Sequence, residues 1–121
     1  MPVKISKPAV FEAIGNKPIL IEEYFGKVNS NNDEVSIAYL KCPGNWIEPP
    51  QEPEFDEYTL VLKGTLRIST KEKYYDVSPG EAILTQRKEW IQYSTPNGEG
   101  AEYIAVCLPA FTMERANRED Y

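Results

Sequence analysis

The sequence predicts an all-β protein built as one domain. Short segments rich in β-branched and aromatic residues alternate with turn signals at roughly 8–12-residue spacing, which is typical of a β-sandwich or a β-barrel. No amphipathic stretch of about 10–15 residues lies between these segments, so a parallel sheet with crossover helices is not expected. The chain of 121 residues is long enough to bury one core and has the length of one domain. About eight or nine short strands fit a jelly roll of two facing sheets.

The first half of the chain contains two clear strands and a proline-rich loop. Residues 9–14 are ambiguous and could form a short helical turn. Pro18–Phe25 is expected to be a strand because isoleucine, tyrosine and phenylalanine favour strands, and the turn signal Asn29–Asp33 follows it. Val35–Cys42 is the next expected strand. The prolines at 49, 50 and 53 then rule out a helix or a central strand.

The second half of the chain contains the remaining expected strands, which are separated by tight turns. Tyr58–Leu62 is one of them, and Gly64 interrupts it before the next strand begins at Thr65 and runs to Ser69. Polar, glycine or proline turns bound the later strands, which are 74–77, 82–85, 90–94 and 103–108. The tail, residues 111–121, is polar and could hold a short helix or lie along the surface.

The charge balance disfavours two classes of partner. The chain has 13 Lys and Arg residues against 19 Asp and Glu residues, which gives a net charge of -6. An acidic chain without a basic block is repelled by nucleic acid and by an anionic membrane surface. No stretch approaches the roughly 20 apolar residues of a membrane helix, and the N-terminus lacks an apolar signal core. A cytoplasmic location is therefore expected.

The absence of histidine excludes several kinds of active site. The chain has no histidine and two cysteines, Cys42 and Cys107. Catalytic Ser-His-Asp and Cys-His arrangements need an imidazole, as do most zinc and iron sites. Two cysteines are too few for a four-thiolate zinc site. In a reducing compartment they are expected to be free thiols, and a single disulfide bond between them is the alternative.

A segment in the middle of the chain resembles the first sequence motif of the cupin superfamily. That motif has a glycine, five residues, His-x-His, three or four residues, a glutamate, six residues and a glycine. Gly44, Glu57 and Gly64 fall on this spacing. The second cupin motif would begin at Gly80, and residues 103–111 resemble the last strand and exit of small bacterial single-domain cupins. The resemblance covers roughly residues 35–111.

The resemblance implies a single cupin domain over residues 1–121. Its fold would be a cupin jelly-roll barrel, or double-stranded β-helix, with short N- and C-terminal extensions. Cupins usually bind one divalent metal through the two motif-1 histidines, the motif-1 glutamate and a motif-2 histidine. Here Ile91 stands in the motif-2 position. The motif-1 histidine positions hold, depending on the register, either Pro50 and Glu52 or Gln51 and Pro53.

We therefore expect no metal cofactor. Proline and isoleucine side chains have no donor atom, so Glu57 alone remains from the metal-binding set that the resemblance implies. Glu57 together with Gln51 or Glu52 and water could hold Mn²⁺ or another divalent cation weakly.

The resemblance places the candidate site inside the barrel. Glu57 begins a strand on which Thr59 shares its inward face, and a desolvated carboxylate there could act as a general base. Tyr93 could orient a ligand or donate a proton. The structural alternatives are that Glu57 holds the barrel mouth by hydrogen bonds and that Tyr93 is a core aromatic. The expected catalytic residues are Glu57 and Tyr93, and the expected ligand-binding residues are Gln51, Glu52, Glu57, Thr59, Tyr93 and Tyr103.

A cluster of acidic residues also lies in this segment. We interpret it as a solvated acidic loop, with a cation-binding rim as the alternative. Its members are Glu48, Glu52, Glu54, Asp56 and Glu57.

The preferred function is a cupin-like small-molecule-binding protein with a metal-free site. The alternatives are a metal-independent isomerase, epimerase or lyase that uses Glu57 as its base, a weak oxygen-ligand Mn or Fe enzyme, and an inert structural dimer. A homodimer is expected from the resemblance and from the apolar strand Ile19–Phe25, which needs a partner if it lies at a sheet edge.

Overall fold

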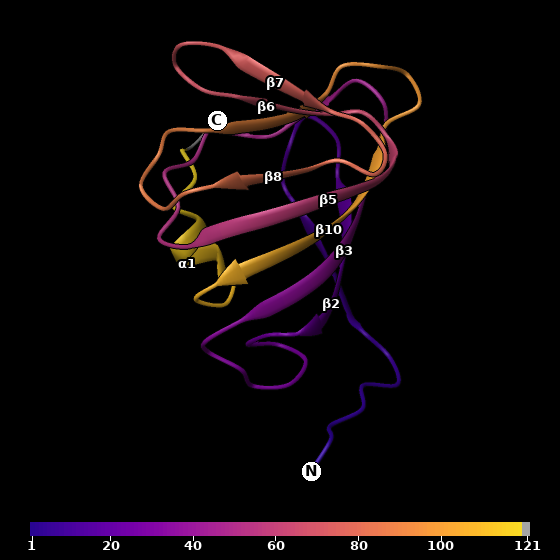
Figure 1. The fold of residues 1–121 in the computed structure, drawn as a ribbon, viewed down its shortest axis with the longest axis vertical. Coiled ribbons are helices and arrows are strands. Elements are labelled where there is room, and N and C mark those ends of the chain that lie inside the picture. The colour runs from indigo at the N-terminus through magenta and orange to yellow at the C-terminus, as the bar shows by residue number, and fades with distance from the viewer. Residues whose placement is uncertain (120–121) are drawn as a thin grey trace.

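The computed structural model describes residues 1–119 and consists almost entirely of antiparallel strands, which form two sheets and confirm the all-β prediction (Figure 1). The larger sheet contains, in spatial order, β1 (Ala9–Ala13), β2 (Ile19–Phe25), β3 (Ser36–Cys42), β10 (Ala101–Leu108), β5 (Asp56–Gly64) and β8 (Ala82–Thr85). The smaller sheet contains β4 (Trp46–Ile47), β9 (Gln92–Thr95), β6 (Leu66–Ser69) and β7 (Tyr74–Val77). Sequential strands often lie in different sheets, as in a jelly roll.

The segment 9–14 does not form the helical turn that its sequence allowed. Ala9–Ala13 is strand β1, which pairs with β2 in an antiparallel register from Ala9 opposite Glu23 to Ala13 opposite Ile19. Ala13 is buried and Phe11 packs against the core. The strand pairing and this alternate burial outweigh the weak local preference of a short segment.

The two central strands of the larger sheet position the interior of the protein. β5 and β10 pair along most of their length, with Glu57 opposite Cys107 and Thr59 opposite Ala105. Alternation along β5 buries Glu57 and Thr59, as the sequence predicted, together with Val61, and exposes the residues between them. Side chains of these two strands therefore line the same space between the sheets.

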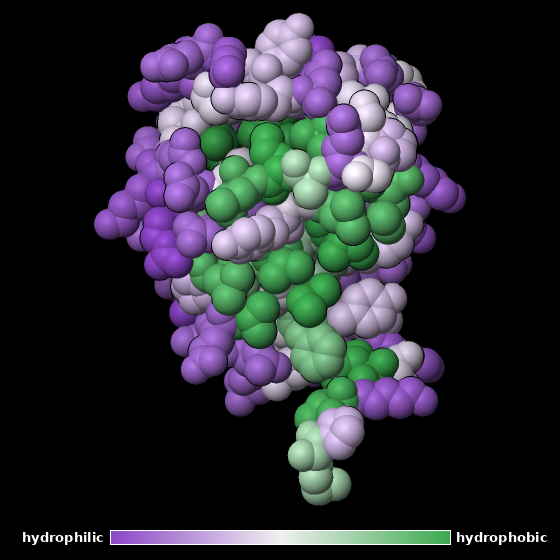
Figure 2. Space-filling model, viewed as in Figure 1, coloured by the Kyte–Doolittle hydropathy of each residue, from purple (hydrophilic) through white to green (hydrophobic). Residues whose placement is uncertain are grey.

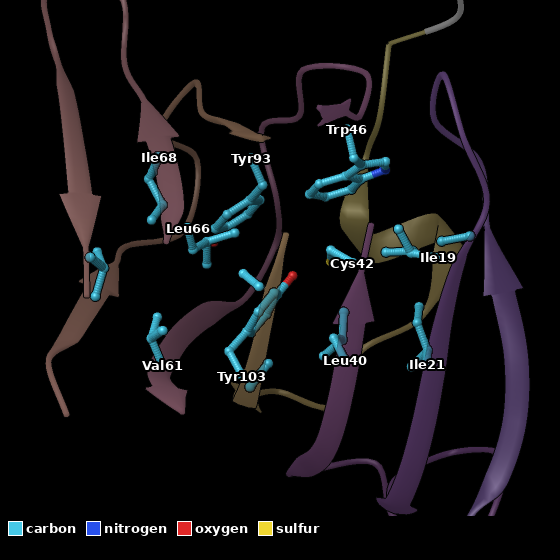
Figure 3. Packing of buried hydrophobic residues seen from close by; sticks show 14 of the residues in the cluster. Ile19, Ile21, Leu40, Cys42, Trp46, Val61, Leu66, Ile68, Tyr93 and Tyr103 are labelled. Atoms are coloured by element: carbon cyan, nitrogen blue, oxygen red, sulfur yellow. The ribbon is translucent and has the colours of Figure 1, made fainter. Parts of the chain in front are cut away.

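The main hydrophobic core lies between the two sheets (Figure 3). Tyr93 comes from β9 of the smaller sheet and Tyr103 from β10 of the larger sheet, and both rings point into this interior together with Trp46. Aliphatic side chains such as Val61 and Leu66 are fully buried around them. Burying one such side chain contributes roughly 1.5–3 kcal/mol to stability.

The C-terminal segment folds back against the proline-rich loop. Helix α1 (Met113–Ala116) begins after Thr112, whose side chain accepts a hydrogen bond from the backbone of Arg115, and ends at Asn117 in the left-handed conformation. After it, the amide of Glu52 donates to the carbonyl of Asn117 and the amide of Glu119 donates to the carbonyl of Pro50. The tail thus contains a short helix, which is one of the two arrangements that its sequence allowed. The last two residues of the expected tail, 120 and 121, lie outside the described residues.

The outer face of the larger sheet carries exposed hydrophobic side chains, which gather in one region of the surface (Figure 2). We call this region the outer apolar patch and define it by Tyr58, Leu60, Leu62, Leu84 and Leu108, each 39–48% exposed. The patch follows from strand alternation, because these residues occupy the outward positions of β5, β8 and β10. Among residues 1–119, no helix is long and apolar enough to cross a membrane.

Candidate ligand-binding cavity

A small cavity of about 40 Å³ lies in the interior of the protein. Ile19, Ile21 and Leu40 form part of its apolar wall, and its polar groups come from strands, a loop and the C-terminal segment. One buried water needs roughly 10–15 Å³, whereas sites for drug-sized ligands span about 300–1,000 Å³. In this conformation the cavity therefore has room for waters or for a ligand of a few heavy atoms.

Glu57 projects from β5 into this cavity. The residue is only 7% exposed, and Thr59 Oγ1 lies 3.4 Å from Glu57 Oε2 as a hydrogen-bond donor. Burial raises the pKa of Glu57 to about 7, and the nearby Arg118 guanidinium opposes part of this rise. A carboxyl group with this pKa exchanges its proton near neutral pH, as a general acid or base requires.

Glu48 is a second buried carboxyl group, which the sequence analysis named only as a member of the acidic cluster. It is 2% exposed and lines the same cavity. Burial raises its pKa to about 7, while Arg118 lowers it and Glu57 raises it. The interpretation of the acidic cluster as a solvated loop is therefore wrong for Glu48, which is buried. Glu57 is buried as its place on the inward face of the strand predicted, and Glu52 and Glu54 are exposed.

Arg118 brings a positive charge to the cavity from the C-terminal segment. Its Nη2 atom lies 3.0 Å from Glu48 Oε2, and its Nε donates to Gln51 Oε1 at 3.4 Å. The guanidinium also lies 5.9 Å from the ring centroid of Phe111. Its Nη1 atom is buried and has no hydrogen-bond partner among the described residues. No sequence motif marks Arg118, since only the folded tail places it beside Glu48.

Two tyrosines complete the polar lining. The Tyr93 hydroxyl is 3.0 Å from Thr85 Oγ1, and burial followed by the charge of Glu57 raises the pKa of Tyr93 well above its usual value. Burial and Cys42 raise the pKa of Tyr103 in the same way. Both phenols stay protonated at neutral pH. They can donate hydrogen bonds to a ligand, and they are weak proton donors in a reaction.

Of the residues predicted for the site, Gln51, Glu57, Tyr93 and Tyr103 line the cavity. Thr59 is buried beside Glu57, although it does not line the cavity itself. Glu52 does not belong to this group, because its side chain is exposed on the opposite side of the chain.

The same alternation decides the register of the first motif. Gln51, Pro53, Phe55 and Glu57 are all buried, so the inward positions are Gln51 and Pro53. The backbone amide of Gln51 donates to the carbonyl of Ile91, and the amide of Ile91 donates back, both at 2.9 Å. The structure thus brings the segments of both motifs together, as the resemblance implied.

These residues do not fit the metal that the resemblance would imply. Pro53 and Ile91 occupy two of the inward positions and have no donor atom. The Arg118 guanidinium lies against Gln51 Oε1, where it would repel a divalent cation. Within residues 1–119, no three His, Cys, Asp or Glu side chains form a group that could hold a metal ion.

The two cysteines are buried free thiols in the described part of the chain. Cys107 lines the cavity and faces Glu57, and burial followed by the charge of Glu57 raises its pKa well above the usual value. Burial raises the pKa of Cys42 to about 12. Neither thiol is a reactive nucleophile, because the thiolate form is disfavoured.

Comparisons with known proteins place the chain structurally. No protein-family model matches it. Over 100 residues it is 40% identical to a Myxococcus xanthus protein described as endoribonuclease YbeY, and the match spans 82% of this chain and 34% of that protein. The chain therefore corresponds to about a third of that relative.

Two solved structures are similar over nearly the whole chain. One is a protein from Thermotoga maritima described as a predicted oxalate decarboxylase, with a TM-score of 0.72, 17% identity, and coverage of 90% of this chain and 99% of the other. The other is the polyketide cyclase RemF from Streptomyces resistomycificus, with a TM-score of 0.69, 18% identity, and coverage of 96% and 89%. Similarity at this level of identity concerns the fold.

Proposed function

The chain has the cupin fold, and we propose that it binds a small organic molecule in the cavity between its sheets without the help of a metal ion. The observation that carries the proposal is the convergence of Glu48, Gln51, Glu57 and Arg118 on one buried cavity. Burying such groups is costly, and apolar side chains would fill the same space with less loss of stability. Their presence in the interior therefore supports a role in binding.

The size of the cavity limits the ligand. A volume of about 40 Å³ accepts only a compact molecule while the C-terminal segment covers the site. The segment from Asn117 to Glu119 is held by the two backbone hydrogen bonds to the proline-rich loop described above and by the pair between Arg118 and Glu48. A larger ligand would need this segment to move away.

A metal-independent isomerase, epimerase or lyase remains the second candidate. The observation in its favour is the pKa of Glu57, which burial raises to about 7. A base of this strength, held beside the cavity, suits the removal of a proton next to a carbonyl group. The donor set of the cavity gives less support to a weak Mn or Fe enzyme, because Arg118 lies against Gln51.

We do not carry the ribonuclease description of the Myxococcus xanthus relative over to this chain. The chain matches only about a third of that protein, and its net charge of -6 disfavours contact with RNA phosphates.

We further propose a reducing compartment such as the cytoplasm, which is consistent with two free buried thiols.

The proposal is tested by a fragment screen on isotope-labelled protein. Small neutral, anionic and cationic compounds are titrated in turn, and chemical shifts are followed at Tyr93, Tyr103 and the Nε–H of Arg118. We expect saturable shifts at these residues for at least one class. Glu57→Gln is compared with Glu54→Gln, which changes an exposed glutamate of the same segment. We expect Glu57→Gln, and not Glu54→Gln, to alter the chemical-shift changes that the bound compound causes at the cavity residues.

Two further outcomes decide the proposal. If no compound of any charge perturbs cavity residues, the proposal of a binding site is wrong. If a compound is turned over, and Glu57→Gln keeps its binding while abolishing turnover, the enzyme alternative replaces simple binding.

A further inference from the structure

We propose that Arg118 is the recognition residue of the cavity, and that the ligand is a small uncharged carbonyl compound whose oxygen accepts a hydrogen bond from Arg118 Nη1. This inference rests on the proposed binding function and specifies its ligand class. The starting observation is that Arg118 lines the cavity and that its Nη1 atom is buried without a hydrogen-bond partner among residues 1–119. Buried donors are almost always paired, so an unpaired one at a cavity indicates a missing acceptor.

The other donors of Arg118 are already engaged. Nη2 pairs with Glu48 at 3.0 Å, and Nε lies 3.4 Å from Gln51 Oε1. These two contacts fix the plane of the guanidinium, because its five N–H donors have a rigid geometry. With the side chain held in this way, the direction of its remaining donor, Nη1, is also fixed.

The charge of the cavity decides between a neutral and an anionic ligand. Three carboxyl groups line it: Glu48, Glu57 and Glu23. Glu23 Oε2 accepts hydrogen bonds from the amides of Val28 and Asn29, both at 3.0 Å. Against them, Arg118 is the one cationic side chain among the described lining residues. A ligand carboxylate would add a further negative charge to a desolvated site whose positive charge is already shared.

The charges of the cavity disfavour a cationic ligand less strongly than an anionic one, but a cation would leave the Nη1 donor of Arg118 without an acceptor. An ammonium group would gain from the carboxylates, yet it offers no acceptor to Nη1 and would be repelled by the guanidinium. A neutral carbonyl group satisfies the donor at no cost in charge. The phenols of Tyr93 and Tyr103 on the same cavity then contact the rest of the molecule.

The test uses three probes of similar size on the full-length protein: acetamide, acetate and ethylammonium. Acetamide and acetate have nearly the same shape, so the comparison isolates charge. Dissociation constants are measured by NMR titration above neutral pH. We expect acetamide to bind at least about tenfold more tightly than acetate, since the anion has no unshared positive charge to pair with. Tighter binding of acetate or of ethylammonium contradicts the inference.

Arg118→Lys tests the role of the guanidinium itself. A lysine keeps a positive charge for Glu48 but has a single compact head group, which cannot pair with Glu48 and also place a donor at the position of Nη1. We expect the affinity for acetamide to fall about tenfold or more while the melting temperature changes little. Arg67→Lys, at a surface pair with Asp76, serves as the control and should leave binding unchanged.

The outcomes separate this inference from the proposed function. Cavity shifts with acetamide that persist unchanged in Arg118→Lys mean that the cavity binds ligands and that Arg118 is only structural. In that case the inference fails and the binding function stands. The absence of cavity shifts with all three probes and throughout the wider fragment screen overturns both. If Arg118→Lys is unfolded, Arg118→Gln combined with Glu48→Gln removes both charges and provides the same comparison.

Discussion

At the scale of single residues, the unusual feature is the pair of buried carboxyl groups. Burial raises the pKa of both Glu48 and Glu57 to about 7. The guanidinium of Arg118 is near both carboxyl groups and opposes part of this rise in each. In the unfolded chain these groups ionise near their ordinary pKa of 4.5. The folded state therefore binds more protons than the unfolded state between about pH 4.5 and pH 7, so stability falls as the pH rises through this window and levels off above it.

Glu57→Gln should remove part of this pH dependence. At pH 5 the variant is expected to be about as stable as the wild type, in which Glu57 is protonated. At pH 8 it is expected to be more stable by about 3 kcal/mol, because the wild type must keep an ionised carboxylate buried. Urea denaturation followed by tryptophan fluorescence at both pH values measures the difference.

The control for this prediction is Glu54→Gln, since Glu54 is exposed and lies three residues before Glu57, just outside β5. It should leave the pH profile unchanged. A variant Glu57→Gln that is equally destabilised at both pH values would mean that the carboxylate is ionised and well paired in the folded state, contrary to the geometry.

At the scale of elements, the glycine that ends β5 is required by its backbone conformation and its surroundings. Gly64 has a φ of +72°, and a Cβ atom at this position would overlap the carbonyl oxygen of Gly100. The chain thus needs glycine both for its backbone conformation and for the close approach of the turn before β10. Strand β5 carries Glu57, so this turn also holds the register of the cavity wall.

Gly64→Ala is expected to lower the free energy of unfolding by roughly 2–4 kcal/mol, through backbone strain and a steric clash. Gly80 provides a matched control, because its φ is +84° and a Cβ atom added there would have no other atom within 4 Å. Gly80→Ala should therefore cost only the conformational strain, about 1 kcal/mol. Equal losses in chemical denaturation of the two variants would show that the clash at Gly64 is relieved without cost.

The elements were largely predictable from the sequence, with instructive exceptions. Strands such as β3 and β10 follow from short runs of β-forming residues bounded by turn signals. Strand β1 was missed because a five-residue segment has little pattern of its own and becomes a strand by pairing with β2. The two-residue strand β4 was missed for the same reason, since it exists through its pairing with β9.

At the scale of the whole molecule, the outer apolar patch requires an explanation. Tyr58, Leu60, Leu62, Leu84 and Leu108 lie together on the outer face of the larger sheet, over β5, β8 and β10 (Figure 2). Contiguous exposed apolar surface is unusual in a monomer and marks an interaction site. The sequence predicted a homodimer partly because the strand Ile19–Phe25 would need a partner if it lay at a sheet edge. That premise is wrong, because β2 pairs with β1 on one side and with β3 on the other. The distribution of exposed side chains favours this sheet face instead.

We therefore predict a homodimer in which this face is buried. Leu60→Lys places a charge at the centre of the patch and should shift the protein towards the monomer, and Lys71→Glu at the polar turn before β7 should not. Light scattering at micromolar concentration distinguishes the two states. A wild-type protein that is monomeric under these conditions contradicts the prediction.

The sequence by itself determined the strand pattern, the inward face of β5 with Glu57, and the loss of the imidazole ligands, because each of these depends on residue type and on alternation over a few neighbouring positions. Only the tertiary structure decided that Glu48 and Arg118, far apart in the chain, form one buried pair beside Glu57. The physical reason is that the burial of a charged group depends on what the rest of the fold packs against it. Arg118 reaches the cavity because the C-terminal segment after α1 turns back and is hydrogen-bonded to the proline-rich loop.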